Sequence, residues 1–174
     1  MTKPALNWSY RTTEIPETGL RETRVATPAE CTALAAELQI VSCDKLTASF
    51  TIRAIGKGHY RLAGELKGRV TQPCVVTLEP VSEGVEGNFD VEYWPPASIP
   101  ETGEEEIEVL SAAEIEPIEH GYIDVGRIVF ETLAASLNPY PRKPGAVFED
   151  SEPEPPSEGG SSAFEALKKL KEGR

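Results

Sequence analysis

The sequence predicts a single α+β domain in which an antiparallel β-sheet is flanked by two helices. Two observations predict the sheet: runs of alternating apolar and polar residues, typical of half-buried strands, and short connections, which favour antiparallel neighbours. Two capped segments with a helical period predict the helices. Such a sheet could also curl into a partial barrel. We expect this domain over residues 1–148, a disordered acidic linker over 149–161 and a short amphipathic tail helix over 162–174.

The first helix has a recognisable start. Thr27 can cap the free N–H groups, Pro28 suits the first helical position and Glu30 completes a capping box. The helix is therefore predicted over 27–38. The residues before it are polar and irregular, although two aromatic side chains there could anchor the segment or open a strand: Trp8 and Tyr10.

Four successive segments after this helix show the alternation of half-buried strands. The residues that we expect to face the core are Leu46, Ala48, Phe50 and Ile52 in the first segment, Tyr60, Leu62, Leu66 and Val70 in the second, Cys74, Val76 and Leu78 in the third, and Val85, Phe89, Val91 and Tyr93 in the fourth. A glycine-rich turn at 56–58 separates the first two, because glycine tolerates positive φ. The third segment, QPCVVTLEPV at 72–81, therefore places Cys74 in a core strand.

The second helix is predicted over 124–137. Asp124 is its expected N-cap, and the prolines that follow Asn138 cannot continue it. Two short apolar elements are expected before it, at 107–110 and 115–118.

The tail helix begins at a further capping box and is too short to be stable alone. It either folds back on the domain or docks on a partner. The residues that would make this contact are the apolar stripe Phe164, Leu167 and Leu170 and the lysines Lys168 and Lys169.

The net charge of -12 arises within one stretch of the chain, residues 100–160. Residues 100–160 hold 15 acidic and 3 basic residues, and the remaining parts of the chain sum to zero. Such acidic runs are commonly solvated loops or tails, and they repel nucleic acid. The functional alternative is a surface that attracts a basic protein partner.

The residue types that most enzymes and metal sites need are sparse. The three cysteines form no CxxC pair, and the two histidines, His59 and His120, stand beside turns without a third ligand at suitable spacing. The carboxylate pair Glu114/Glu116 lies in a segment so acidic that we interpret it as solvated. We therefore expect no enzyme activity, no metal, no cofactor and no small-molecule substrate.

Targeting signals are equally sparse. No apolar run has the length that crosses a bilayer, and the N-terminus lacks the apolar core of a signal peptide. An odd number of cysteines fits a reducing compartment. The protein is expected in the cytoplasm, without membrane contact.

A basic strip is predicted on the outer face of the sheet. Residues 41–80 carry a net charge of +3 in an otherwise acidic chain, and the strip could contact RNA phosphates. The alternative is an ordinary solvated strand face, since no aromatic residues are interleaved to stack bases. The residues of the strip are Arg53, Lys57, Arg61, Lys67 and Arg69.

Three blocks of the sequence resemble one known family. They are Leu62–Gly68 leading into QPCVVTLEPV, then EPIEHGYIDVGRIVFETLAASLNPYPRKPG at Glu116–Gly145, and SAFEALKKLK at Ser162–Lys171. In this order they resemble the YceD family of bacterial and plastid proteins, named for large ribosomal RNA subunit accumulation. The likeness covers roughly residues 15–174, and the middle block is its most specific part.

The resemblance implies a bacterial, non-enzymatic factor in large ribosomal subunit biogenesis that supports 23S rRNA accumulation. It carries over no catalytic residues. The acidic charge favours action through a basic ribosomal protein, and the alternative is direct binding of 23S rRNA by the basic strip. Many relatives have a CxxC pair where this chain has Cys74 and Thr77, so the resemblance also implies a function without metal here.

Overall fold

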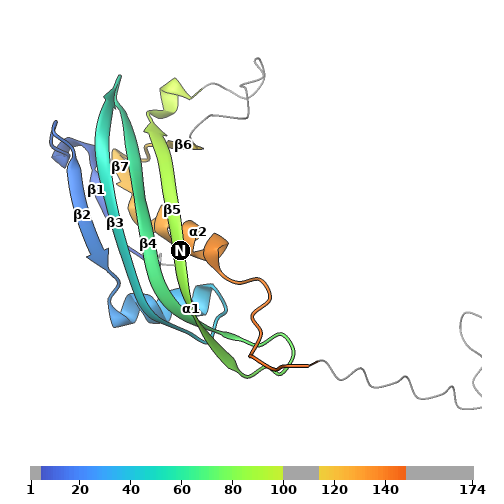
Figure 1. Cartoon of the computed structure of the whole chain (residues 1–174). Coiled ribbons are helices and arrows are strands. Elements are labelled where there is room, and N and C mark those ends of the chain that lie inside the picture. The colour runs from blue at the N-terminus through green and yellow to red at the C-terminus, as the bar shows by residue number, and fades with distance from the viewer. Residues whose placement is uncertain (1–4, 100–113, 148–174) are drawn as a thin grey trace, which may run out of the picture. The chain divides into compact units, whose positions relative to one another are not determined.

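A computed structural model describes residues 5–99 and 114–147 of the chain (Figure 1). The chain divides into two units, Met1–Pro144 and Gly145–Arg174, and the fold below is that of the first. The predicted linker, the tail helix and the apolar element at 107–110 lie outside the described residues. None of the helices in the described ranges is long and apolar enough to cross a membrane.

A five-stranded sheet forms the body of the domain (Figure 1). Its strands, in spatial order, are β2 (Leu20–Val25), β3 (Ser42–Gly56), β4 (His59–Pro73), β5 (Pro80–Trp94) and β6 (Glu114–Pro117). Neighbours are antiparallel except β5 and β6, which are parallel. The prediction of an antiparallel sheet is therefore wrong at this edge. Parallel pairing needs a long crossover, and the connection from β5 to β6 is long enough to provide it.

The sheet does not close into a barrel, because β2 and β6 lie at opposite ends of the strand order and do not pair. The structure has three strands where the sequence predicted four, and each of the three has 15 residues. The prediction of a strand for the third segment is wrong, because Cys74 lies in the turn between β4 and β5 and Leu78 is 77% exposed. Pro73 and Pro80 flank this turn, and Leu78 adopts φ +60, which bends the chain back.

Both predicted domain helices are confirmed. The first, α1 (Pro28–Glu37), begins with the expected capping box, in which Thr27 accepts the Glu30 N–H at 3.3 Å and the Glu30 carboxylate accepts the Thr27 N–H at 2.8 Å. The second, α2 (Val125–Ser136), is capped by Asp124, whose carboxylate accepts the Arg127 N–H at 3.1 Å.

Two short strands lie outside the main sheet. β1 (Ser9–Arg11) pairs antiparallel with β7 (Tyr122–Asp124), and short 3₁₀ turns occupy Thr12–Glu14 and Pro96–Ser98. Trp8, just before β1, is buried and donates its indole N–H to Glu30 at 2.9 Å. Trp8 thus anchors the N-terminal segment, and Tyr10 lies in the opening strand β1, so each of the two predicted alternatives occurs at one aromatic residue.

One hydrophobic core joins the helices to the sheet. The predicted inward residues of β3, β4 and β5 are buried, apart from Tyr60, which is half-buried. The helix residues that complete the core are Leu34 of α1 and Val125, Ile128, Val129 and Leu133 of α2. The opposite face of the sheet carries the polar members of the alternating runs and faces solvent.

Candidate binding surfaces

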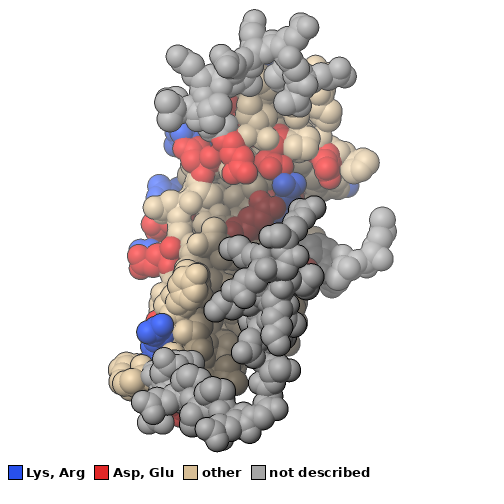
Figure 2. All heavy atoms as spheres, turned by 90° about the vertical axis from the view of Figure 1, so that its right-hand side faces the viewer, with Lys and Arg blue, Asp and Glu red and all other residues tan. Residues whose placement is uncertain are grey.

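Acidic side chains gather where β5, β6 and α2 meet. Figure 2 shows acidic side chains gathered on this side of the domain, with basic side chains among them. We call this set the acidic edge. Its residues are Glu86, Asp90 and Glu92 of β5, Glu114 and Glu116 of β6, and Glu131 of α2.

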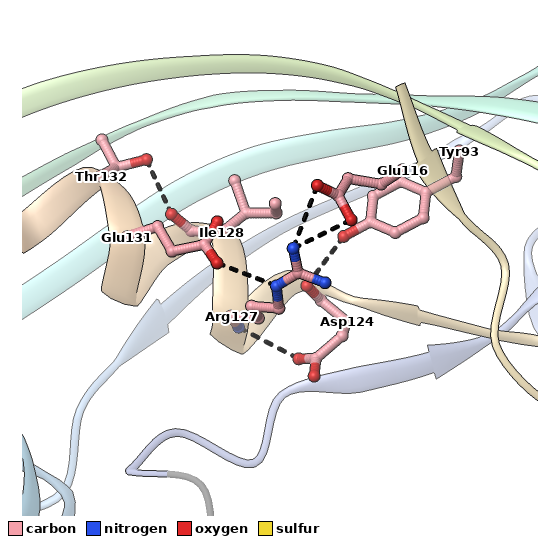
Figure 3. Close-up of polar contacts among 7 residues, drawn as sticks. All are labelled: Tyr93, Glu116, Asp124, Arg127, Ile128, Glu131 and Thr132. Atoms are coloured by element: carbon pink, nitrogen blue, oxygen red, sulfur yellow. Dashed lines mark hydrogen bonds and ion pairs between the residues drawn. The ribbon is translucent and has the colours of Figure 1, made fainter. Parts of the chain in front are cut away.

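Arg127 organises part of the acidic edge (Figure 3). Its guanidinium donates to Glu116 at 3.0 Å and to Glu131 at 2.9 Å. The carboxylate of Asp124 instead accepts the backbone N–H of Arg127 in the first turn of the same helix, so two carboxylates flank the guanidinium. Arg127 therefore fixes the positions of these acids without neutralising all of them.

The backbone explains why these groups meet. Arg127 and Glu131 are one helical turn apart, a spacing that favours an ion pair. The parallel pairing of β6 with β5 places Glu116 beside Tyr93, whose hydroxyl donates to the Asp124 carbonyl at 3.0 Å. Burial, reinforced by the nearby charges of Asp124 and Glu116, raises the pKa of Tyr93, so its hydroxyl stays protonated as a donor.

The histidines do not form a site with these acids. His120 is exposed beside a turn, whereas His59 stacks on Trp94 with ring centroids 4.4 Å apart. Within the described residues, no three side chains of the types His, Cys, Asp and Glu are grouped so that they could hold a metal ion.

The residues of the predicted basic strip are all exposed, but they fall into two groups. Arg53 and Arg61 face each other across β3 and β4, near Lys57 in the turn. Arg61 donates to Asp90 at 2.7 Å and lowers the pKa of that carboxyl. The charge of this first group is therefore partly compensated within the protein.

The second basic group surrounds a hollow of about 580 Å³ on the outer face of the sheet. Lys67 and Arg69 line it together with Lys45, which pairs with Arg69 across the strands. Lys67 follows Arg61 by six positions in β4, roughly 20 Å along a strand. Lys45 was missed in the sequence, although it precedes the alternating run of β3 and has the phase of its outward residues.

Cys74 is fully buried, but its sulfur sits among hydrogen-bond donors. It accepts backbone N–H groups from Val76 at 3.4 Å, Thr77 at 3.5 Å and Lys143 at 3.4 Å. Hydrogen bonds from the Thr77 side chain and from these backbone groups lower the pKa of the Cys74 thiol to about 6. It is therefore neither a strand residue nor an ordinary apolar core residue.

The other two cysteines meet where α1 packs on β3. Cys31 and Cys43 are both buried and line one hollow of about 310 Å³. Burial, with the neighbouring Cys31, raises the pKa of Cys43 to about 12. Sequence spacing alone could not show this pair, because the helix and the strand bring the two thiols together.

One comparison with known proteins identifies the family of the chain. The model of the family described as large ribosomal RNA subunit accumulation protein YceD matches residues 62–171. The chain belongs to the YceD family. No curated protein and no solved structure matches the chain.

The YceD match contains the whole acidic edge, Arg127 and Cys74, whereas Lys45 and Arg53 lie before it. The family name connects the chain with accumulation of the large ribosomal RNA subunit. The remaining predicted contact residues, Phe164, Leu167, Lys168, Lys169 and Leu170, lie outside the described part of the chain.

Proposed function

We propose that this YceD protein acts in large ribosomal subunit biogenesis as a binding factor, not an enzyme, and that its acidic edge binds a basic ribosomal protein. The observation that carries the proposal is the acidic edge itself, where carboxylates from three separate elements gather on one side of the domain (Figure 2). Glu86 and Glu114 have no ion-pair partner among the described residues, so their charges are available to a partner.

The charge of the acidic edge also distinguishes the two classes of partner, a basic protein and RNA. An acidic surface attracts lysine and arginine side chains and repels RNA phosphates. A protein of net charge -12 that supports ribosomal RNA accumulation therefore acts more readily through a basic ribosomal protein than through the RNA itself.

Charge reversal of the acidic edge tests this function. We expect Glu86→Lys with Glu114→Lys to lower the capture of purified large-subunit ribosomal proteins roughly tenfold at low salt, because like charges then face the partner. Rising salt should weaken capture by the unchanged protein. The matched control is Glu14→Lys with Glu37→Lys, which changes the net charge equally at exposed positions on other elements. Equal capture by both double variants would contradict the proposal.

Direct 23S rRNA binding is the second candidate. The hollow on the outer face favours it, because Lys45, Lys67 and Arg69 line it against a single carboxylate, Glu65. Three exposed cations at one place could neutralise successive phosphates of an RNA strand. Glu86 of the acidic edge lies across from Lys67 on the same face, so an RNA strand here would also approach this carboxylate.

A gel-shift titration distinguishes this candidate. If RNA binds in the hollow, Lys67→Glu with Arg69→Glu should weaken binding of a 23S rRNA fragment roughly tenfold or more and flatten its salt dependence. Arg53→Glu with Lys57→Glu is the matched control in the other basic group. No shift with the unchanged protein, or equal loss in both variants, would count against RNA binding at this hollow.

A further inference from the structure

Among the described residues, the strand β5 has a free edge along most of its length. On one side it pairs with β4 over 14 residues, from Tyr60↔Tyr93 to Pro73↔Pro80. On the other side it pairs with β6 only at Val91–Trp94. No described strand pairs with this edge between residues 80 and 90.

The ladder of β4 and β5 shows which backbone groups face the free edge. The Cys74 N–H donates to the Glu79 carbonyl at 2.8 Å, next to the Pro73↔Pro80 pair. Hydrogen-bonded and non-hydrogen-bonded pairs alternate from there, because the register has no shift. The backbone N–H and C=O groups that point away from β4 therefore belong to Ser82, Gly84, Glu86 and Asn88. None of these groups has a hydrogen-bond partner among residues 5–99 and 114–147.

A groove lies beside the free edge of β5. A hollow of about 420 Å³ lies between β5 and α2, and its lining includes Asn88, Asp90, Glu114, Glu131 and Thr132. A strand added to β5 would place alternate side chains on this side of the sheet, where the groove gives them room. The other side chains would lie beside Glu86 on the outer face.

The negative charge of the acidic edge limits which molecules could pair with the free edge of β5. Glu86 and Glu114 are unpaired among the described residues, whereas Asp90 and Glu131 each have one arginine partner. A second copy of this chain would bring Glu86 close to carboxylates of the same edge, which is unfavourable. A segment with alternate basic side chains would instead place its cations on one face of the sheet, beside Glu86 on the outer face or beside Glu114 at the groove.

We propose that an extended lysine- and arginine-rich protein segment binds by adding to the free edge of β5 as a further strand. Backbone hydrogen bonds to Ser82, Gly84, Glu86 and Asn88 hold it, and the acidic edge selects it by charge. This inference rests on the proposed function, since it says how the basic partner is bound. Edge strands of other proteins bind extended peptides in the same way.

A pair of synthetic peptides tests strand addition separately from charge. The probe is a fluorescent peptide of alternating lysine and valine, about ten residues long to match the free edge. The control peptide has the same sequence with N-methyl groups on alternate residues, placed in both possible phases, which removes the N–H donors but keeps every charge. We expect the methylated peptides to bind about tenfold more weakly at physiological salt.

Two variants of Asn88 provide the matching test on the protein. Proline at this position removes a donor that faces the edge and leaves the β4 ladder intact, because Glu65↔Asn88 is a non-hydrogen-bonded pair. We expect Asn88→Pro to lose about tenfold in peptide affinity and Asn88→Thr to stay within about twofold. Circular dichroism checks the fold of both, and the methylated peptides keep the test valid if the proline variant does not fold.

Hydrogen exchange supplies an independent readout. The amide protons of Ser82, Gly84, Glu86 and Asn88 should become protected when the unmodified peptide is added, whereas those of Val85 and Gly87 already bond to β4 and should change little. Equal binding of methylated and unmodified peptides would overturn strand addition while leaving charge-driven capture in place. Absence of peptide binding, with ribosomal-protein capture retained, would also overturn this inference alone.

Discussion

Gly87→Val is expected to destabilise the protein markedly. A Cβ atom at Gly87 would lie 2.6 Å from the Ser136 hydroxyl oxygen and 2.7 Å from the Thr132 methyl carbon. Both contacts are on α2, so the helix can approach the sheet only because this position lacks a side chain. Valine would displace α2, and overpacking of this kind costs about 1–3 kcal/mol of unfolding free energy.

Gly84 provides the matched control in the same strand. A Cβ atom there would find its nearest neighbour 4.0 Å away. Gly84→Val should therefore be neutral, or stabilising by roughly 0.5–1 kcal/mol, because glycine is unfavourable inside a strand. Denaturant unfolding followed by tryptophan fluorescence measures both changes. Equal unfolding midpoints for the two variants would show that the packing of α2 on the sheet does not require glycine at position 87.

Short-range sequence patterns predict the helices and most strands of this fold, but they do not predict how these elements assemble. Thr27, Pro28, Glu30 and Asp124 fix both helix starts through short-range hydrogen bonds, so the sequence alone reveals them. The parallel pairing of β6 could not be predicted, because it depends on how a long connection returns to the sheet. The same long-range contact brings Glu116 to Arg127, which explains why the organised part of the acidic edge was missed.

The β4–β5 turn could not be predicted from the alternation of apolar and polar residues alone. Cys74, Val76 and Leu78 alternate with other residues as strand residues do, yet the chain turns here. The two prolines at 73 and 80 were the available signal, since paired prolines cannot continue a ladder. Burial of Cys74 was predicted, but not its hydrogen-bonded surroundings, because Lys143 reaches the sulfur from a segment distant in sequence.

The hydrogen-bonded Cys74 thiol should make the stability of the protein depend on pH. Its pKa is about 6 in the folded protein and about 9 in the unfolded chain. Between these values the folded state has released the proton and the unfolded state still holds it, so stability rises with pH. The contribution is fully present above about pH 9 and disappears as the pH falls through about 6.

Cys74→Ala removes this contribution, and Cys43→Ala serves as its control. The deficit of Cys74→Ala in unfolding free energy should therefore be largest near pH 9 and shrink steadily towards pH 6. Cys43 has the opposite sign: its folded pKa is raised to about 12, so its contribution is complete below about pH 9 and is lost only as the pH rises towards 12. Cys43→Ala should thus show a constant deficit between pH 6 and about pH 8. Urea unfolding at several pH values measures both deficits, and a Cys74→Ala deficit that does not change with pH would mean that the buried sulfur stays protonated.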